Sequence, residues 1–311
     1  MSAEPGGPSP FHAGELLAQA LAGGAGGSAI RDYMPEQHRD FFGLLPYLLA
    51  ATTDEAGWPS ATMLSGPAGF VGSPDIRSLQ IAVSPPDLAP YTAQFAAGKS
   101  IGLLGIDLAT RRRNRANGVI TAANGDGLLV AVSQSFGNCP KYIQLREVHA
   151  VPAGPDQAGQ PDAEYFTRLD QPARDLIVRS DTLFVATTSG NSGPNSGVDI
   201  SHRGGRPGFV RIDGDSLTIP DFVGNRYFNT LGNMLADPRA AVLFVDFANG
   251  DLLHVQGEVE VLWDSPDTGA FQGAQRLWRL HVKRGWRRPG AIPLRWSLLE
   301  YAPTTLQTGS W

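Results

Sequence analysis

The chain contains two diverged copies of one pattern, and this internal repeat limits what it can fold into. Residues 48–71 are LLAATTDEAGWPSATMLSGPAGFV, and residues 183–210 are LFVATTSGNSGPNSGVDISHRGGRPGFV. Three identical pairs continue the match at an offset of 139: Phe70 and Phe209, Asp107 and Asp246, Gly118 and Gly257. Copies this long indicate a duplicated domain rather than a solenoid of short repeats. We therefore expect two similar domains that pack as an intrachain pseudo-dimer.

The composition fits two β-rich domains. The 311 residues suffice for two domains of about 150 residues, each with its own core. Charged residues make up only 18%, whereas 37 glycines and 24 prolines favour a protein rich in turns. With 30 acidic against 25 basic residues, non-specific nucleic-acid binding is not expected. The single cysteine excludes an internal disulfide and a cysteine-rich zinc site.

The sequence also predicts where the protein works and how it is divided. The first ten residues, MSAEPGGPSP, lack the basic and apolar regions of a secretory signal, and no apolar run reaches membrane-spanning length. We expect a cytoplasmic protein with no membrane segment. Its predicted parts are an N-terminal helical segment (1–40), a first barrel (41–150), a linker and helix (151–180), and a second barrel (181–311).

Short β segments separated by turn residues dominate both copies. Helices are predicted at 9–22 (capped by Ser9), 37–45, 85–99, 163–177 and 224–238. Each copy thus has about six strands with one inserted helix. A small closed barrel suits this pattern because it leaves no open edge. The predicted fold class is mainly β with inserted helices (α+β), in the form of two tandem split β-barrels.

Four strings resemble a known family: GNCPKYIQ (137–144), SHRGGRPGFVR (201–211), GNRYFNTLGNMLADPRA (224–240) and LLHVQGEVEVLW (252–263). They are similar to the pyridoxamine-phosphate-oxidase-like FMN-binding split-barrel superfamily, and within it to the branch with two barrels in one chain. The resemblance implies six-stranded split barrels with FMN in the groove between them. It also implies either a monomer that forms a pseudo-dimer or a homodimer.

Candidate phosphate ligands cluster in the second copy. A flavin phosphate needs arginine forks, backbone N–H groups and a helix start. Arg203 follows a predicted strand, and Arg211 lies on the next one. The remaining candidates surround the start of the predicted inserted helix: Gly224, Asn225, Arg226, Asn229 and Thr230.

The first copy lacks these groups. Gly72 stands where Arg211 stands in the second copy, and the prolines of SPPDLAPYT replace the N–H donors of GNRYFNT. Residues 63–65 (MLS) align approximately with 201–203 (SHR). We therefore predict one flavin per chain, with its phosphate on the second copy.

The first copy offers cations of its own. Strand alternation in ATRRRNRANG would point Arg111 and Arg113 to one side. The resemblance places Arg113 at a polar contact to the flavin ring, and Lys141 is a second candidate. His202 is a candidate for polarising flavin or substrate. For each of these residues an ordinary surface or packing role remains the alternative, as it does for Cys139 and for the tryptophans at 286, 296 and 311.

The family resemblance leads to two functional hypotheses. Motifs of Rossmann folds, P-loops, zincins and α/β-hydrolases are absent from the sequence. The first hypothesis is an FMN-dependent oxidoreductase that acts on a small molecule and takes electrons from NAD(P)H or a separate reductase. The second is a non-catalytic binding or storage protein. FAD or haem is the alternative cofactor, no metal site is predicted, and the catalytic residues are unknown.

Overall fold

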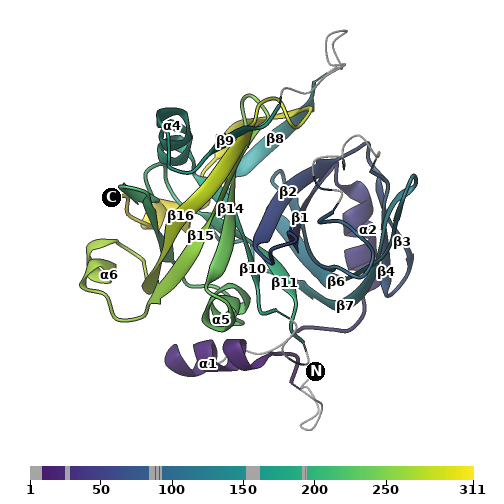
Figure 1. Ribbon diagram of the computed structural model, residues 1–311, viewed down its shortest axis with the longest axis horizontal. Helices are drawn as coiled ribbons and strands as arrows, with labels where there is room; N and C mark the ends of the chain where they lie inside the picture. The colour runs from purple at the N-terminus through teal and green to yellow at the C-terminus, as the bar shows by residue number, and fades with distance from the viewer. Residues whose placement is uncertain are drawn as a thin grey trace.

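The computed structural model describes residues 9–24, 29–83, 88, 91, 93–151, 162–190, 193 and 195–311. Two strongly curved antiparallel sheets stand side by side, one from each copy of the repeat (Figure 1). Helices lie around them, with α1 beneath α5 at one end of the groove between the sheets. The predicted fold class of two tandem split barrels is confirmed.

The first barrel is a seven-stranded sheet with the order β2-β1-β5-β6-β7-β4-β3. Helix α2 (Glu36–Leu44) precedes it. Its strands are β1 (Tyr47–Thr53), β2 (Pro59–Ser65), β3 (Val71–Asp75), β4 (Ser78–Ile81), β5 (Ser100–Asp107), β6 (Arg112–Asn124) and β7 (Gly127–Gly137).

The second barrel repeats this order as β11-β10-β14-β15-β16-β13-β12, and the short strand β9 (Glu164–Phe166) adds to β16. Its strands are β10 (Thr182–Thr188), β11 (Val198–Gly204), β12 (Arg211–Asp213), β13 (Ser216–Asp221), β14 (Arg239–Asp246), β15 (Asp251–Leu262) and β16 (Arg276–Arg288). Three helices accompany them: α4 (Gln171–Arg179), α5 (Asn229–Ala236) and α6 (Pro266–Ala270). The family resemblance implies six strands per barrel, whereas the strand order of each barrel sheet contains seven strands.

The central strands bury both faces, which explains their unbroken apolar sequences. In β1, Leu48 faces the core of the first barrel, and its neighbour Leu49 faces a second core between the barrels. In β10, Leu183 faces the core of the second barrel, and Phe184 faces the core between the barrels. Contacts across the interface are reciprocal, since β2 packs on β14 just as β11 packs on β5. The repeat therefore forms the two-fold, self-complementary interface of a homodimer within one chain.

The paired glycines of the repeat hold equivalent β-bulges. The ladder shifts register at Gly118 in β6 and at Gly257 in β15. A Cβ on Gly118 would lie 1.9 Å from the Ala131 carbonyl oxygen, and one on Gly257 would lie 2.3 Å from that of His281. Only glycine permits this approach, so both copies keep it at the same position.

Substituting either bulge glycine with alanine is expected to destabilise the protein. The added methyl would force two backbones apart, which costs about 1–3 kcal/mol in overpacked sites. Gly125→Ala is the matched control because a Cβ there meets nothing within 4 Å. Urea unfolding should show a lower midpoint for Gly118→Ala and Gly257→Ala only. Equal midpoints for all three variants would contradict this explanation of the repeat.

A third, two-stranded sheet joins the halves of the chain. Strand β8 (Leu145–Ala150) follows the first barrel and pairs with β17 (Leu294–Glu300), which follows the second. Beneath it, Arg146 forms a buried bidentate ion pair with Asp181, at 2.6 and 2.8 Å. The halves are therefore linked by backbone and charge as well as by their apolar interface.

Helix α1 (Ala13–Leu21) is buried through its polar side rather than its apolar side. Glu15 and Gln19 face the protein, while Leu16, Leu17 and Leu21 are 45–52% exposed. Glycines allow α1 and α5 to pack closely, since a Cβ on Gly232 would lie 2.5 Å from Glu15 Cα. The apolar periodicity correctly predicts a helix here, but the face it marks is the outer one.

Several predicted helix boundaries are wrong. Helix α1 begins at Ala13 with His12 as its cap, because the His12 side chain accepts from the Gly14 N–H where Ser9 was expected to act. The segment predicted as a helix over 163–177 begins as strand β9, and Asp170 caps α4 further on. Helix α5 starts five residues later than its predicted start at residue 224. In the segment predicted as a helix over 85–99, residues 93–99 form turns, and six of the fifteen residues lie outside the described ones. The linker predicted at 153–163 falls largely outside the described residues.

Candidate cofactor site

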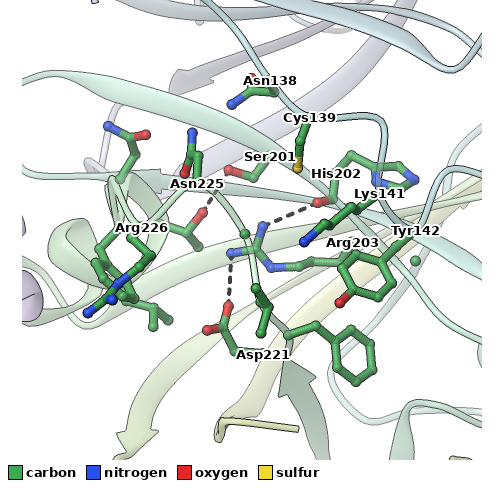
Figure 2. A pocket seen from close by; sticks show the side chains of 18 of the residues that line it. Asn138, Cys139, Lys141, Tyr142, Ser201, His202, Arg203, Asp221, Asn225 and Arg226 are labelled. Atoms are coloured by element: carbon green, nitrogen blue, oxygen red, sulfur yellow. Dashed lines mark hydrogen bonds and ion pairs between the residues drawn. The ribbon is translucent and has the colours of Figure 1, made fainter. Parts of the chain in front are cut away.

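A polar pocket opens in one of the two grooves between the barrels. Its walls come from β6 and residues 138–142 on the first-barrel side, and from β11, the end of β13 and the start of α5 on the second-barrel side. The cavity volume between these walls is about 100 Å³, below the range of about 300–1,000 Å³ that is typical of small-molecule and cofactor sites. Figure 2 shows its polar side chains converging from both barrels.

Three guanidinium groups dominate this pocket. Arg115 is 6% exposed and donates to the hydroxyl of Ser201 and to Asn229 Oδ1. Arg113 donates through Nε to the Cys139 carbonyl, at 3.0 Å. Arg203 donates to the His202 carbonyl and lies 3.6 Å from a carboxylate oxygen of Asp221 (Figure 2).

Positive charge exceeds negative charge around these arginines. Burial lowers the pKa of all three guanidinium groups, that of Arg115 to about 10, yet each stays protonated at neutral pH. Arg203 shares its nearest carboxylate with another arginine, because Asp221 also binds Arg276 at 2.7 Å. The Nε atoms of Arg115 and Arg203 are buried and have no hydrogen-bond partner among the described residues. Buried donors of this kind are normally satisfied, so these two favour a bound anion.

The start of α5 adds backbone donors to the same wall. Residues 224–228 lead into the helix, and Arg226 and Phe228 adopt left-handed φ angles of 62° and 60°. Such angles are uncommon in residues other than glycine and are enriched at functional sites. No side chain caps the helix, so its first N–H groups and its positive dipole end face the pocket at Asn229 and Thr230.

His202 is a buried, neutral histidine. Burial and the neighbouring Arg113 and Arg203 lower its pKa well below the ordinary value. Arg113 Nη1 lies 3.3 Å from Nδ1 and can only donate, which assigns the lone pair to Nδ1 and the proton to Nε2. Nε2 is buried and has no partner within the described part of the chain. His202 can therefore donate one hydrogen bond but is a poor proton acceptor.

Most of the residues predicted from sequence meet in this pocket. It is lined by Arg113, Lys141, His202, Arg203, Gly224, Asn225, Arg226, Asn229 and Thr230. They come from segments up to 117 residues apart (113 to 230) and from both barrels. The predicted contribution of both copies to one groove corresponds to this arrangement.

Two predicted residues lie elsewhere. Arg211 is paired with Asp267 at 2.7 Å and stacked on Trp311 at 4.2 Å. Arg111 is in a left-handed turn before β6, so strand alternation does not apply to it, and it donates to the Ile143 carbonyl. Arg226 lines the pocket, but its guanidinium donates to the Ala22 and Gly24 carbonyls beyond α1.

Sequence reasoning missed other pocket residues. Arg115 is the most buried cation of the pocket. Strand alternation could have predicted it, because Arg115 lies two residues beyond Arg113 and therefore on the same face of β6. Tyr142 and Phe222 form a stacked pair with ring centroids 5.0 Å apart, and their meeting depends on tertiary structure. Cys139 also lines the pocket. Trp286, Trp296 and Trp311 are not among its lining residues.

The equivalent groove on the other side is filled by side chains. Thr62 is the structural equivalent of Ser201, because Ala50 pairs with Thr62 in the first sheet just as Val185 pairs with Ser201 in the second. The sequence alignment pairs Ser201 with residue 63 and is therefore shifted by one position. His254 occupies the position of Arg115, opposite Trp286 in the ladder, and stacks on that ring at 4.6 Å. Tyr91 replaces Thr230 and accepts a hydrogen bond from Thr62. Bulky rings thus fill the positions equivalent to the first pocket, while a different cavity of about 570 Å³ opens beside Trp286, Arg284 and Gln256.

The comparison with protein families finds one match, in the second half of the chain. The sequence model of the family described as "Pyridoxamine 5'-phosphate oxidase" matches residues 169–291, which lie in the second half of the chain. None of the curated proteins matches the sequence. The matched region contains β11 and the start of α5, the second-barrel wall of the pocket.

The solved structures in the comparison cover about 40% of this chain each. HupZ of Group A Streptococcus has 16% identity and a TM-score of 0.29 over 37% of this chain and 89% of its own. A putative pyridoxamine 5'-phosphate oxidase from Lactobacillus delbrueckii has 13% identity and a TM-score of 0.31, over 39% and 94%. A FAD-binding protein from Mesorhizobium loti has 11% identity and a TM-score of 0.26, over 40% of this chain and 96% of its own.

The groove between two split barrels defines the class of protein. Residues 169–291 match the pyridoxamine 5'-phosphate oxidase family model, and both halves of the chain have the split-barrel fold that the motifs predict. Among the described helices, none has the length and apolar character needed to cross a membrane. Nor do the described residues form a His, Cys, Asp and Glu cluster that could hold a metal ion.

Proposed function

We propose that this chain binds one FMN in the pocket between the barrels and acts as a flavin-dependent oxidoreductase on a small molecule. The observation that carries the proposal is the set of buried arginine donors, left without partners, beside the uncapped start of α5. Together they offer charge, forked donors and backbone N–H groups, the chemistry that a phosphate requires. The match to the pyridoxamine 5'-phosphate oxidase family is the reason for proposing that the phosphate belongs to a flavin.

The residues present fit the parts of FMN. Arg203 and the N–H groups of Asn229 and Thr230 would hold the phosphate on the second barrel. The stacked rings of Tyr142 and Phe222 offer an apolar surface for a flat ring system. Lys141 and Arg113 place positive charge on the opposite wall, where it would stabilise an anionic reduced flavin. When bound, FMN would supply the one- or two-electron chemistry.

His202 favours flavin over haem. An imidazole binds iron through an unprotonated ring nitrogen. The only lone pair of neutral His202 faces Arg113, and Nε2 carries the proton. Iron ligation through Nε2 would require the other tautomer, which would place an N–H against a guanidinium. Nε2–H is instead suited to donate to a carbonyl or phosphate oxygen.

The expected stoichiometry is one FMN per chain, because Tyr91 and His254 fill the equivalent groove. Flavin fluorescence titration of the purified protein should saturate at one equivalent, and the loaded protein should be yellow. Riboflavin, which lacks the phosphate, is the matched control and should bind far more weakly. Two equivalents, or no binding of either FMN or FAD, would contradict the proposal.

Turnover needs a separate test. The proposed electron donor is NAD(P)H or a separate reductase. Anaerobic mixing with NADH or NADPH should bleach the bound flavin, and adding a reducible substrate or oxygen should restore its colour. If FMN binds but neither nicotinamide nor a flavodoxin- or ferredoxin-type reductase bleaches it, the non-catalytic storage alternative replaces the enzymatic one.

A further inference from the structure

Among the described residues, helix α1 has no counterpart in the second copy, and it covers only the groove that holds the pocket. It precedes both copies in sequence and packs on α5, beside the wall formed by Asn229 and Thr230 (Figure 1). The segment before it is also anchored to this groove, where Gln134 of β7 donates to the Pro10 carbonyl. At the equivalent position in the other groove, Arg284 pairs with Asp54 and Gln256 instead. The helix therefore contributes to one site only.

A chain of hydrogen bonds leads from α1 to the pocket. Glu15 Oε1 accepts from Asn229 Nδ2, and Asn229 Oδ1 accepts from Arg115 Nη1 at 3.3 Å. Asn229 thus uses both ends of its amide to connect a carboxyl group on α1 with the most buried guanidinium of the pocket. Glu15 is only 2% exposed, so water cannot stand in for these partners.

We propose that Glu15 is a positioning residue for the anion pocket, and that it takes up a proton when a phosphate-bearing ligand binds. As a neutral acid it orients Asn229 and Arg115 without opposing the incoming negative charge. As a carboxylate it would compete with the ligand for Arg115. This inference deepens the proposed cofactor site and depends on it for the identity of the ligand.

The groups around Glu15 favour its neutral form. Asp199 on β11 is the nearest other carboxylate and lies 3.5 Å from Arg115 Nη1, so one arginine faces two acids. His12 is neutral: its Nδ1 accepts from the Gly14 N–H, and its Nε2 donates to Asn233 Oδ1. Glu15 also accepts hydrogen bonds from the His12 N–H and from Asn229, and its Oε2 lies 3.6 Å from Nε2 of the neutral His12 ring. Burial, followed by repulsion from Asp199, raises the pKa of Glu15 to about 8.

The direction of the pH effect follows from this charge balance. An anion beside Arg115 would raise the pKa of Glu15 further, so binding near pH 8 draws a proton from solution. Affinity should therefore decrease as pH rises from 7 to 9.5. Flavin phosphate is already a dianion throughout this window, because its second pKa is about 6. The dependence would thus report on the protein rather than on the ligand.

Calorimetric titration with FMN at pH 8 tests the proton uptake directly. In two buffers of different ionisation enthalpy, the apparent binding enthalpy of the wild type should differ, whereas Glu15→Gln should give equal values. Between pH 7 and 9.5 the wild-type affinity should decrease roughly threefold or more, and that of Glu15→Gln should stay flat. Cys139→Ser is the control for the ionisable thiol in the pocket and should retain the wild-type dependence. Equal enthalpies in the wild type, or a dependence removed by Cys139→Ser, would overturn the proposal.

Two further measurements separate this inference from the choice of FMN. Sulfate is a dianion at every pH used, and its stabilisation of the wild type against heat should weaken above pH 8, but not in Glu15→Gln. Without ligand, the raised pKa means that the folded wild type loses stability as pH rises from about 4.5 to 8. The melting temperature of Glu15→Gln relative to wild type should increase over that range. If FMN fails but sulfate behaves as described, only the cofactor assignment is wrong. If the melting difference is independent of pH, the role of Glu15 is wrong.

Discussion

Replacing Arg203 with alanine should lower FMN affinity by about 10- to 100-fold and leave the protein folded. A hydrogen bond to a charged group contributes about 1.5–3 kcal/mol, and each 1.4 kcal/mol corresponds to a factor of about ten in Kd. The buried Nε of Arg203 has no partner among the described residues, so a phosphate gains a donor that nothing else uses. Asp221 keeps its 2.7 Å ion pair with Arg276, so the substitution strands no buried carboxylate. Fluorescence titration measures the affinity, and unfolding curves check the fold.

Arg211→Ala is the matched control for this experiment. Arg211 lies on the same barrel and is an equally strong candidate from sequence, and its Nε is likewise buried without a partner among the described residues. Its guanidinium, however, pairs with Asp267 and stacks on Trp311, and Arg211 does not line the pocket. Its removal should leave the FMN dissociation constant within about twofold of the wild type. If Arg211→Ala weakens binding and Arg203→Ala does not, the phosphate lies elsewhere on the second barrel and the pocket assignment fails.

The fold was predictable because the repeat and the strand patterns are local in sequence. Strands β1 and β10 are visible in the sequence, since Tyr47–Thr53 and Thr182–Thr188 are short unbroken runs of apolar and β-branched residues. Helix ends were less predictable, because side-chain caps decide them. His12 caps α1 although serine is the commoner choice, and its role depends on Asn233, which is 221 residues away.

The site was predictable to the extent that one copy could be compared with the other. Arg203 and the start of α5 stand out because the first copy has nothing equivalent. Arg211 stands out for the same reason, yet it serves packing. The difference between these arginines lies in tertiary placement, since β12 is at the outer end of its sheet and β11 faces the first barrel. The role of Glu15 had no signal in the repeat, because α1 lies outside both copies.

The same tertiary placement explains why the duplicated protein has one pocket rather than two. A homodimer of identical barrels would have two identical grooves. Here Tyr91 and His254 close one of them, while α1 and Arg115 complete the other. Duplication within one chain permits this division, because each groove can change without altering its counterpart.

Substituting Asp181 with asparagine should be the most destabilising single change considered, at about 3–5 kcal/mol. Asp181 and Arg146 are 5% exposed each and form the bidentate pair beneath the third sheet. Asparagine keeps the size of the side chain but leaves the Arg146 charge buried without a counter-charge. Because this pair joins the end of the first half to the start of β10, its loss should lower the cooperativity of unfolding as well as the midpoint. Urea unfolding, followed by tryptophan fluorescence and circular dichroism, measures both.

A double variant separates charge from packing at this position. In Arg146→Met combined with Asp181→Asn the unpaired charge is gone, and much of the lost stability should return, because an uncompensated buried ion costs more than an apolar replacement. Glu258→Gln is the exposed control: its partner Lys283 is 2.9 Å away, but both side chains are about half exposed. That change should cost under about 1 kcal/mol. If the double variant is as unstable as Asp181→Asn alone, the pair acts through its shape and hydrogen bonds, and the buried charge is not the cause.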